Sequence, residues 1–196
     1  MRAAVRARVG RFSVVAVTIF LLAALGLAAN GLTQQITLTI DDITGAGLSA
    51  KGIRVDYAGA AVVLNISAVN LGTQSWKNVK LNCAALKLEH TRIACDDGVL
   101  ALAEKIPLTF SYRTDKRMLD ITLKPSKDET WQLSMRPGKR GSDLAVRIDG
   151  GRVQRVAAWL PPNLPKFNAG VVNADITYNS EGEVAAKLAL TGAAFA

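Results

Sequence analysis

The residues best suited to chemistry lie together near the middle of the chain. The only two cysteines, Cys83 and Cys95, and the only histidine, His90, fall within LNCAALKLEHTRIACDDGVLAL, residues 81–102. Such a group could bind a metal, act as a redox switch, carry a reactive thiol or form a disulfide. Three ligands are one fewer than a structural zinc site uses, and the spacing is not the C-x-x-C of a redox motif. We therefore expect neither a metal nor a catalytic thiol.

The spacing of the cysteines instead favours a disulfide. Alternating apolar residues on both sides of EHT, residues 89–91, predict a hairpin with its turn near His90. Cys83 and Cys95 would then lie on opposite arms at similar register, and His90 would be a solvated turn residue. A continuous helix would hold the cysteines roughly 18 Å apart at ~1.5 Å per residue, and more than about 7 Å between Cα atoms prevents a bridge.

No other residues form a recognisable catalytic group. A hydrolytic triad needs a histidine beside a nucleophile, and His90 is expected at a turn. The carboxylate doublets Asp41-Asp42 and Asp96-Asp97 are adjacent in sequence, so on strands their side chains would point to opposite faces. The sequence also lacks a glycine-rich phosphate loop. We expect no enzyme activity, no catalytic residue and no cofactor.

The first thirty residues predict a membrane anchor. Residues 1–11 hold four arginines, and the uncharged run FSVVAVTIFLLAALGLAA follows at 12–29. As a helix this run would cover roughly 27 Å at ~1.5 Å per residue, close to the ~30 Å hydrocarbon core of a bilayer. We expect 1–11 to be a cytoplasmic basic segment and 12–29 a single transmembrane helix. A signal peptide cleaved near Ala28 or Ala29 is the alternative.

Either outcome would export the rest of the chain, and an oxidising compartment suits a disulfide. The predicted location is the bacterial inner membrane, with the C-terminal part in the periplasm. The formal net charge is +8, and the four leading arginines supply half of it. The remaining 20 basic and 16 acidic residues leave +4, spread along the chain. A basic face interleaved with aromatics is missing, so we expect no nucleic-acid partner.

Beyond the anchor the pattern is that of a β-protein. Residues 30–152 alternate apolar and polar with period 2, and turn residues separate the runs, which predicts an antiparallel meander. VQRVAAWLPPNLP, residues 153–165, instead predicts a short amphipathic helix that its prolines end. Residues 166–196 predict a hairpin that continues the sheet. The expected fold is mainly β, an open curved sheet with one short helix after the anchor.

The predicted strands share an apolar stripe on one face. An ordinary closed core is one interpretation of such a stripe, and an open groove that accommodates acyl chains is the other, because hydrocarbon needs only a continuous apolar trough. The candidate groove residues are Ile36, Leu38, Leu64, Ile66, Leu81, Leu108, Phe110, Ile121, Leu133, Val146 and Ile148.

Two stretches carry a resemblance to a known family. KLNCAALKLEHTRIACDDGVLAL, residues 80–102, and DGGRVQRVAAWLPPNLPKFNAGVVNADITYN, residues 149–179, follow an arginine-led anchor. Together they resemble the N-terminal part of the AsmA-like bridge proteins, and are most similar to the YdbH-type branch. The resemblance implies an anchored β-taco, a U-shaped sheet whose apolar groove carries phospholipids between the inner and outer membranes.

Bridge proteins of this kind run to many hundreds of residues, whereas this chain has 196. It would therefore supply the anchored base of a bridge. The expected partners are phospholipids, the inner membrane, and other envelope proteins or a C-terminal continuation of the chain. The alternative function is that of an accessory or assembly protein of an envelope or secretion machine, with a closed β domain.

Overall fold

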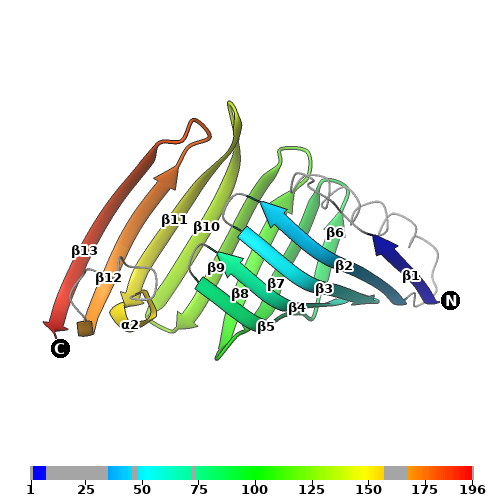
Figure 1. Ribbon diagram of the computed structural model, residues 1–196, viewed down its shortest axis with the longest axis horizontal. Coiled ribbons are helices and arrows are strands. Elements are labelled where there is room, and N and C mark those ends of the chain that lie inside the picture. Colours follow the sequence, from blue (N-terminus) through cyan, green and yellow to red (C-terminus); the bar gives the residue numbers. More distant parts are fainter. Residues whose placement is uncertain (1, 8–34, 46–47, 72–73, 157–166, 196) are drawn as a thin grey trace. The chain divides into compact units, whose positions relative to one another are not determined.

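The computed structural model of the chain describes residues 2–7, 35–45, 48–71, 74–156 and 167–195 (Figure 1). These residues are mainly β-strand, with one short helix. They divide into two compact units. Unit 1 comprises Met1–Ala85 with Val99–Glu104, and unit 2 comprises Leu86–Gly98 with Lys105–Ala196.

Unit 1 holds an open sheet with the strand order β1-β2-β3-β4-β5. Strands β2 to β5 form an antiparallel meander, while β1 pairs with β2 in parallel. Gly59, with φ of +62°, lies in the turn that joins β3 to β4. The strands are β1 (Arg2–Ala7), β2 (Gln35–Gly45), β3 (Leu48–Ala58), β4 (Ala61–Leu71) and β5 (Gln74–Cys83).

In unit 1 the alternation of apolar and polar residues shifts by one residue in each strand, along one line across the sheet. The register keeps Asp41, Gly52, Ser67 and Asn78 opposite one another but leaves them out of the ladder. Gly52 and Asn78 have positive φ, +60° and +55°. A Cβ on Gly52 would clash with the Ser67 hydroxyl oxygen, so this position requires glycine for space as well as for conformation.

The phase change keeps one face apolar on both sides of this line. Before the line the apolar positions include Leu38, Ile40 and Ile53, and after it the pair Ile43 and Ala50 takes over. Ile43 and Ala50 pack against the other three, which form a buried cluster. The line is therefore a bend that the apolar face follows, and a strict period of 2 does not predict it.

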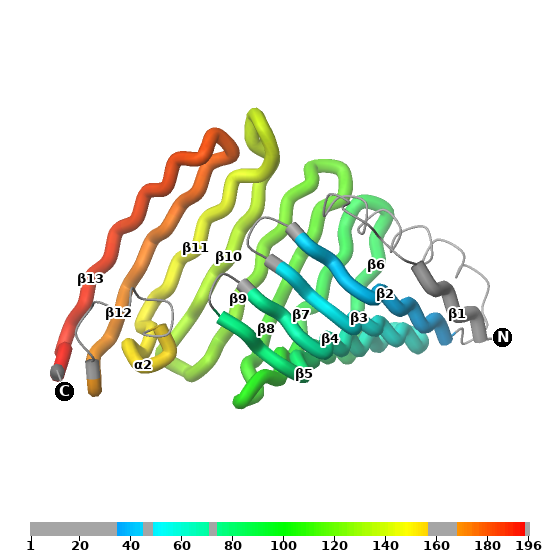
Figure 2. Tube along the Cα trace, in the orientation of Figure 1, coloured from blue at the N-terminus to red at the C-terminus, as the bar shows by residue number. Residues whose placement is uncertain are grey.

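Unit 2 holds an open antiparallel sheet with the order β7-β8-β9-β10-β11-β12-β13, in which residues 92–98 of β7 belong to this unit, and β6 pairs with β7. Consecutive strands from β8 to β13 lie side by side (Figure 2). The strands are β6 (Leu86–Glu89), β7 (Arg92–Ala101), β8 (Lys105–Arg113), β9 (Met118–Ser126), β10 (Glu129–Gly138), β11 (Gly141–Arg152), β12 (Phe167–Tyr178) and β13 (Val184–Phe195).

The helix of unit 2, α2 (Val153–Val156), follows directly on β11 and lies against β11 and β12 (Figure 1). Gly150, near the end of β11, lets the backbone turn from the strand into the helix. Its φ is +67°, and a Cβ there would clash with the Asp128 carbonyl oxygen. Any other residue would force the end of β11 away from the turn before β10.

The structure confirms a mainly β fold with antiparallel open sheets and one short helix. The predicted anchor, 12–29, lies outside the described residues, as does the predicted helical stretch beyond residue 156. Within the described part of the chain, no helix is long and apolar enough to cross a bilayer. The backbone of Arg2–Ala7, inside the predicted basic segment, forms β1.

Candidate functional site

The predicted stripe residues of unit 1 lie on one face of its sheet. Cross-strand partners in a sheet point to the same side. The register places Leu38, Val55, Leu64 and Leu81 in one row across β2 to β5. The neighbouring rows hold Ile36 and Ile66. All five candidate groove residues of unit 1 therefore share a face.

The predicted stripe residues of unit 2 also share one face. Phe110, Ile121, Leu133 and Val146 form one row across β8 to β11. The next row begins with Leu108 and Leu123 and continues through Trp131 and Ile148. All six candidate groove residues of this unit are thus brought together, without an intervening change of register.

The apolar face of unit 2 extends further than the predicted set. The row of Val146 continues through Ile176 to Ala186, and the row of Ile148 continues through Ala174 to Leu188. The same alternation that identified the earlier strands marks these residues in the sequence. The groove residues predicted from the sequence end at β11, although the alternation continues through β12 and β13.

Helix α2 covers one end of this face. Val153 and Val156 pack against Ile148, Val172 and Ala174, and together the five form a buried cluster. Trp131 and Val146 are partly buried against the cluster. Gly151 leaves room for the Ile148 side chain in this cluster, since a Cβ there would lie 2.5 Å from it.

A charged group buried beneath α2 holds the helix in place. Glu129 at the start of β10 is 1% exposed, and its carboxylate forms an ion pair with Arg155 of α2. The same carboxylate accepts hydrogen bonds from the Trp131 indole N–H at 2.9 Å and from the Arg152 backbone N–H at 3.3 Å. A buried carboxylate is costly unless it is paired in this way. Sequence reasoning missed this group, because Glu129 lies more than twenty residues before Arg152 and Arg155.

The other end of the face is open. Large apolar side chains along β13 remain exposed, with Val184 at 67% and Leu188 at 60% of their full accessible surface. Leu190 of β13, and Leu144 and Tyr178 on the neighbouring strands, are exposed as well and lie on the same face. The result is a contiguous apolar patch, which we call the open patch, defined by Leu144, Tyr178, Val184, Leu188 and Leu190.

The opposite face of each sheet is polar. In unit 1, Asp56 receives hydrogen bonds from the Arg54 guanidinium and from the Thr37 hydroxyl at 2.7 Å. The Arg54 bond holds the pKa of Asp56 below its usual value of 3.8, partial burial opposes this, and the Thr37 bond adds to it. In unit 2, the hydrogen bonds and charge of Asp149 raise the pKa of Arg147. These pairs mark the solvated side of the sheets.

The predicted disulfide is confirmed, since Cys83 and Cys95 are both disulfide-bonded and both buried. Its predicted setting is wrong in one respect. The hairpin arm opposite Cys95 is β6, where Leu86 is its partner, and Cys83 instead ends the preceding strand β5. His90 lies exposed in the β6–β7 turn. Among the described residues, no cluster of His, Cys, Asp or Glu has the arrangement of a metal site.

Comparison with known proteins adds no relative. No family model, curated protein or solved structure matches the chain. The candidate site is therefore described by its own geometry: an apolar sheet face that α2 covers at one end and that is open to solvent along β13.

Proposed function

We propose that this chain binds phospholipid acyl chains on the apolar face of its β-sheet and contributes to phospholipid transfer between the inner and outer membranes. The observation that carries the proposal is the open patch of unit 2. Leu188 keeps well over half of its surface exposed although it continues the row of Ile148 and Ala174, which is buried beneath α2. Val184, on the same face of β13, is exposed to a similar degree.

The chemistry of this face suits hydrocarbon. Scattered exposed apolar residues are ordinary on protein surfaces, whereas a contiguous apolar patch marks a site of interaction. Covering it with an acyl chain would contribute about 25 cal/mol for each Å² of apolar surface removed from water. No charged side chain belongs to the open patch, so the bound chain would meet no desolvation cost there.

The distribution of exposure favours a groove over a closed β domain. A closed sandwich or barrel hides its apolar stripe within itself, and an accessory protein built that way would bury Val184 and Leu188. In this chain these residues are more exposed than the apolar residues of β11 in the same rows. We therefore favour lipid binding over the accessory or assembly role.

The wider assignment rests on the sequence. The basic segment and the apolar run at 12–29 favour an inner-membrane anchor with the sheets in the periplasm. The resemblance to AsmA-like bridge proteins of the YdbH type supports a β-taco groove as the form of the complete apolar face. In this proposal, the chain is the anchored base of the lipid path.

The test is the lipid content of the purified full chain. The protein is extracted from membranes with a mild detergent, and the phospholipid bound per chain is measured by mass spectrometry. Leu188→Glu places a charge in the open patch and is expected to reduce the bound phospholipid at least ~5-fold, because a carboxylate is costly to bury against hydrocarbon.

Lys187→Glu is the matched control. Lys187 is the neighbouring residue on the same exposed strand, but it pairs with Asp175 on the polar face. Lys187→Glu introduces the same glutamate side chain as Leu188→Glu and should leave the amount of bound phospholipid unchanged. Equal lipid content in the wild type and both variants would reject the open patch as the binding surface.

A further inference from the structure

The outer edge of β13 carries backbone groups that can pair with a further strand. Among the described strands, β12 is the only one that pairs with β13, which stands at the end of the strand order. In an antiparallel sheet, alternate residues direct their N–H and C=O groups to opposite sides of the strand. Every second residue of β13 therefore directs a donor and an acceptor away from β12, and such an edge is a template for another strand.

The sequence of β13 lacks the features that usually protect an edge strand. Protected edges carry charged residues, a proline or a bulge in the region that could pair. In β13, VAAKLALTGAAF, the only charged residue is Lys187 and there is no proline. The register with β12 is regular from Val184 to Thr191. This regular stretch is the part of the edge that another strand can extend.

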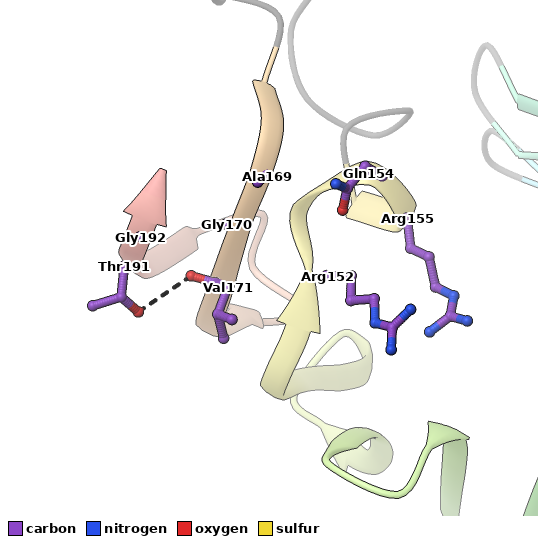
Figure 3. A pocket seen from close by; sticks show the side chains of 8 residues that line it. All are labelled: Arg152, Gln154, Arg155, Ala169, Gly170, Val171, Thr191 and Gly192. Atoms are coloured by element: carbon purple, nitrogen blue, oxygen red, sulfur yellow. Dashed lines mark hydrogen bonds between the residues drawn. The ribbon is translucent and has the colours of Figure 1, made fainter. Parts of the chain in front are cut away.

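The regular stretch ends at Gly192. This residue has a φ of +61° and, together with Ala193, is left out of the ladder with β12. Figure 3 shows Thr191 and Gly192 at this point, where the Thr191 hydroxyl donates to the Val171 carbonyl at 3.5 Å. The irregularity limits a new ladder to the residues that precede Gly192.

A second copy of β13 matches this edge. In an antiparallel pair, the outward-pointing residues of one strand face the outward-pointing residues of the other. Two copies of one strand must therefore pair even-numbered with even-numbered residues and odd with odd. Val184, Leu188 and Leu190 would lie on the same side in both copies, so the apolar face would continue across the junction. Such twofold pairing needs only one self-complementary strand.

The charge of Lys187 selects the register of this pairing. The regular stretch can be centred on Lys187 or on Leu188. A centre at Lys187 would place the two lysines directly opposite each other, and like charges in that position are destabilising. A centre at Leu188 places Lys187 opposite Ala189 of the second copy and Leu190 opposite Ala186. The lysine then faces a small neutral side chain, so the centre at Leu188 is favoured.

We infer that two copies of this chain pair edge to edge through β13, antiparallel, with Leu188 at the twofold axis and a ladder from Ala185 to Thr191. The two copies of the unit 2 sheet then form one continuous sheet. The contact uses the backbone edge and leaves the open patch uncovered. It is therefore independent of lipid binding.

Sedimentation equilibrium of the full chain in a density-matched nonionic detergent measures the dissociation constant of the dimer. Ala189→Glu places a carboxylate opposite Lys187 of the second copy, twice in each dimer. It should lower the dissociation constant about fivefold, and Ala189→Lys should raise it about fivefold. The double variant Lys187→Glu with Ala189→Lys again pairs opposite charges, so it should bind as tightly as Ala189→Glu.

Ala185→Glu is the matched control. Ala185 precedes Lys187 by two residues, as Ala189 follows it by two, and all three side chains are exposed on the same face of β13. In the inferred register Ala185 faces Thr191 of the second copy, so Ala185→Glu should change the dissociation constant less than about twofold. A register centred on Ala186 would exchange the two effects. A dimer that Ala185→Glu tightens and Ala189→Glu does not would overturn the inferred register.

Two other results would overturn the pairing itself. A wild-type chain that stays monomeric at all concentrations would exclude the contact and leave the lipid proposal untouched. A dimer whose dissociation constant ignores the charge at position 189 would place the interface outside β13. Loss of bound phospholipid in Leu188→Glu tests the lipid proposal separately, since the dimer is measured with variants of the polar face.

Discussion

The two units each have a sheet with one apolar face, but they differ in how that face is buried. In unit 1 the face follows a bend at Gly52 and Asn78, and Ile43 and Ala50 pack against the buried residues on the other side of the bend. In unit 2 the rows continue without such a change of phase, and a separate element, α2, covers one end. Along β13 the face is left exposed.

This difference shows why an alternating pattern alone does not distinguish a core from a groove. Ile148 and Leu188 belong to one row, and both are β-strand residues with apolar side chains. One is buried because α2 lies above it, and the other is exposed because no described element does so. The elements that cover the sheet, and not the sheet itself, decide which function the face can have.

The largest expected effect on stability comes from the Glu129–Arg155 ion pair, which holds α2 over the apolar face of unit 2. Glu129→Gln removes the carboxylate that Arg155 pairs with and should lower the free energy of unfolding by about 3 kcal/mol, because it takes the opposite charge away from a largely buried cation. Urea unfolding of the full chain measures this. Asp128→Asn is the control, since this neighbouring acid is 81% exposed and should cost less than about 0.5 kcal/mol. Equal losses would show that α2 does not depend on the buried pair.

A glycine pair tests the bend of unit 1. Gly52→Ala should destabilise the chain by about 2 kcal/mol, from the left-handed backbone and the contact with Ser67 together. Gly59→Ala has nearly the same φ, but nothing lies within 4 Å of the added carbon. It should therefore cost about half as much. If the two variants were equally stable in urea, crowding at the bend would contribute nothing.

A pair of valines compares the two ends of the face in unit 2. Val153→Ala removes two methyl groups from a side chain that is 0% exposed and should cost about 1.5 kcal/mol in urea unfolding. Val184→Ala makes the same chemical change at a side chain in the open patch and should alter stability by less than about 0.5 kcal/mol. A similar cost at both positions would mean that the β13 end is covered in solution.

The smallest effect concerns the polar face of unit 1. The pKa of Asp56 is lowered in the folded chain, so its stabilising contribution is present above pH 3.8 and is lost as the pH falls through the folded-state pKa. Asp56→Asn should remove this part of the acid sensitivity. The urea midpoint of the variant should therefore fall less than that of the wild type between about pH 5 and pH 2. If the urea midpoints of the wild type and Asp56→Asn fell equally with pH, Asp56 would not be a source of the acid sensitivity.

Much of the fold could be predicted because alternation and turn residues act locally. Leu108, Phe110 and their partners fall on one face since a strand reverses direction without changing parity across a tight turn. The disulfide could be predicted from the cysteine spacing together with the expectation that this part of the chain is exported. Its precise setting could not, because nothing in the sequence fixes where β5 ends and β6 begins.

Other features depend on contacts that no local pattern encodes. The bend at Gly52 requires that Ser67 of the next strand lie against it. The Glu129 group joins the start of β10 to α2, and its acid looks like an ordinary surface residue in the stretch SKDETW. The open patch was missed for a different reason, since its alternation is visible but exposure depends on what covers the sheet.

The most direct test of the central claim compares two adjacent residues of β13. p-Benzoylphenylalanine is placed at Leu188, on the open patch, or at Lys187, on the polar face, in the full chain expressed in cells. After illumination, mass spectrometry counts the phospholipid adducts. The account predicts an adduct at position 188 at least ~5 times more abundant than at position 187. Equal yields at the two positions, or no phospholipid adduct at either, would contradict it.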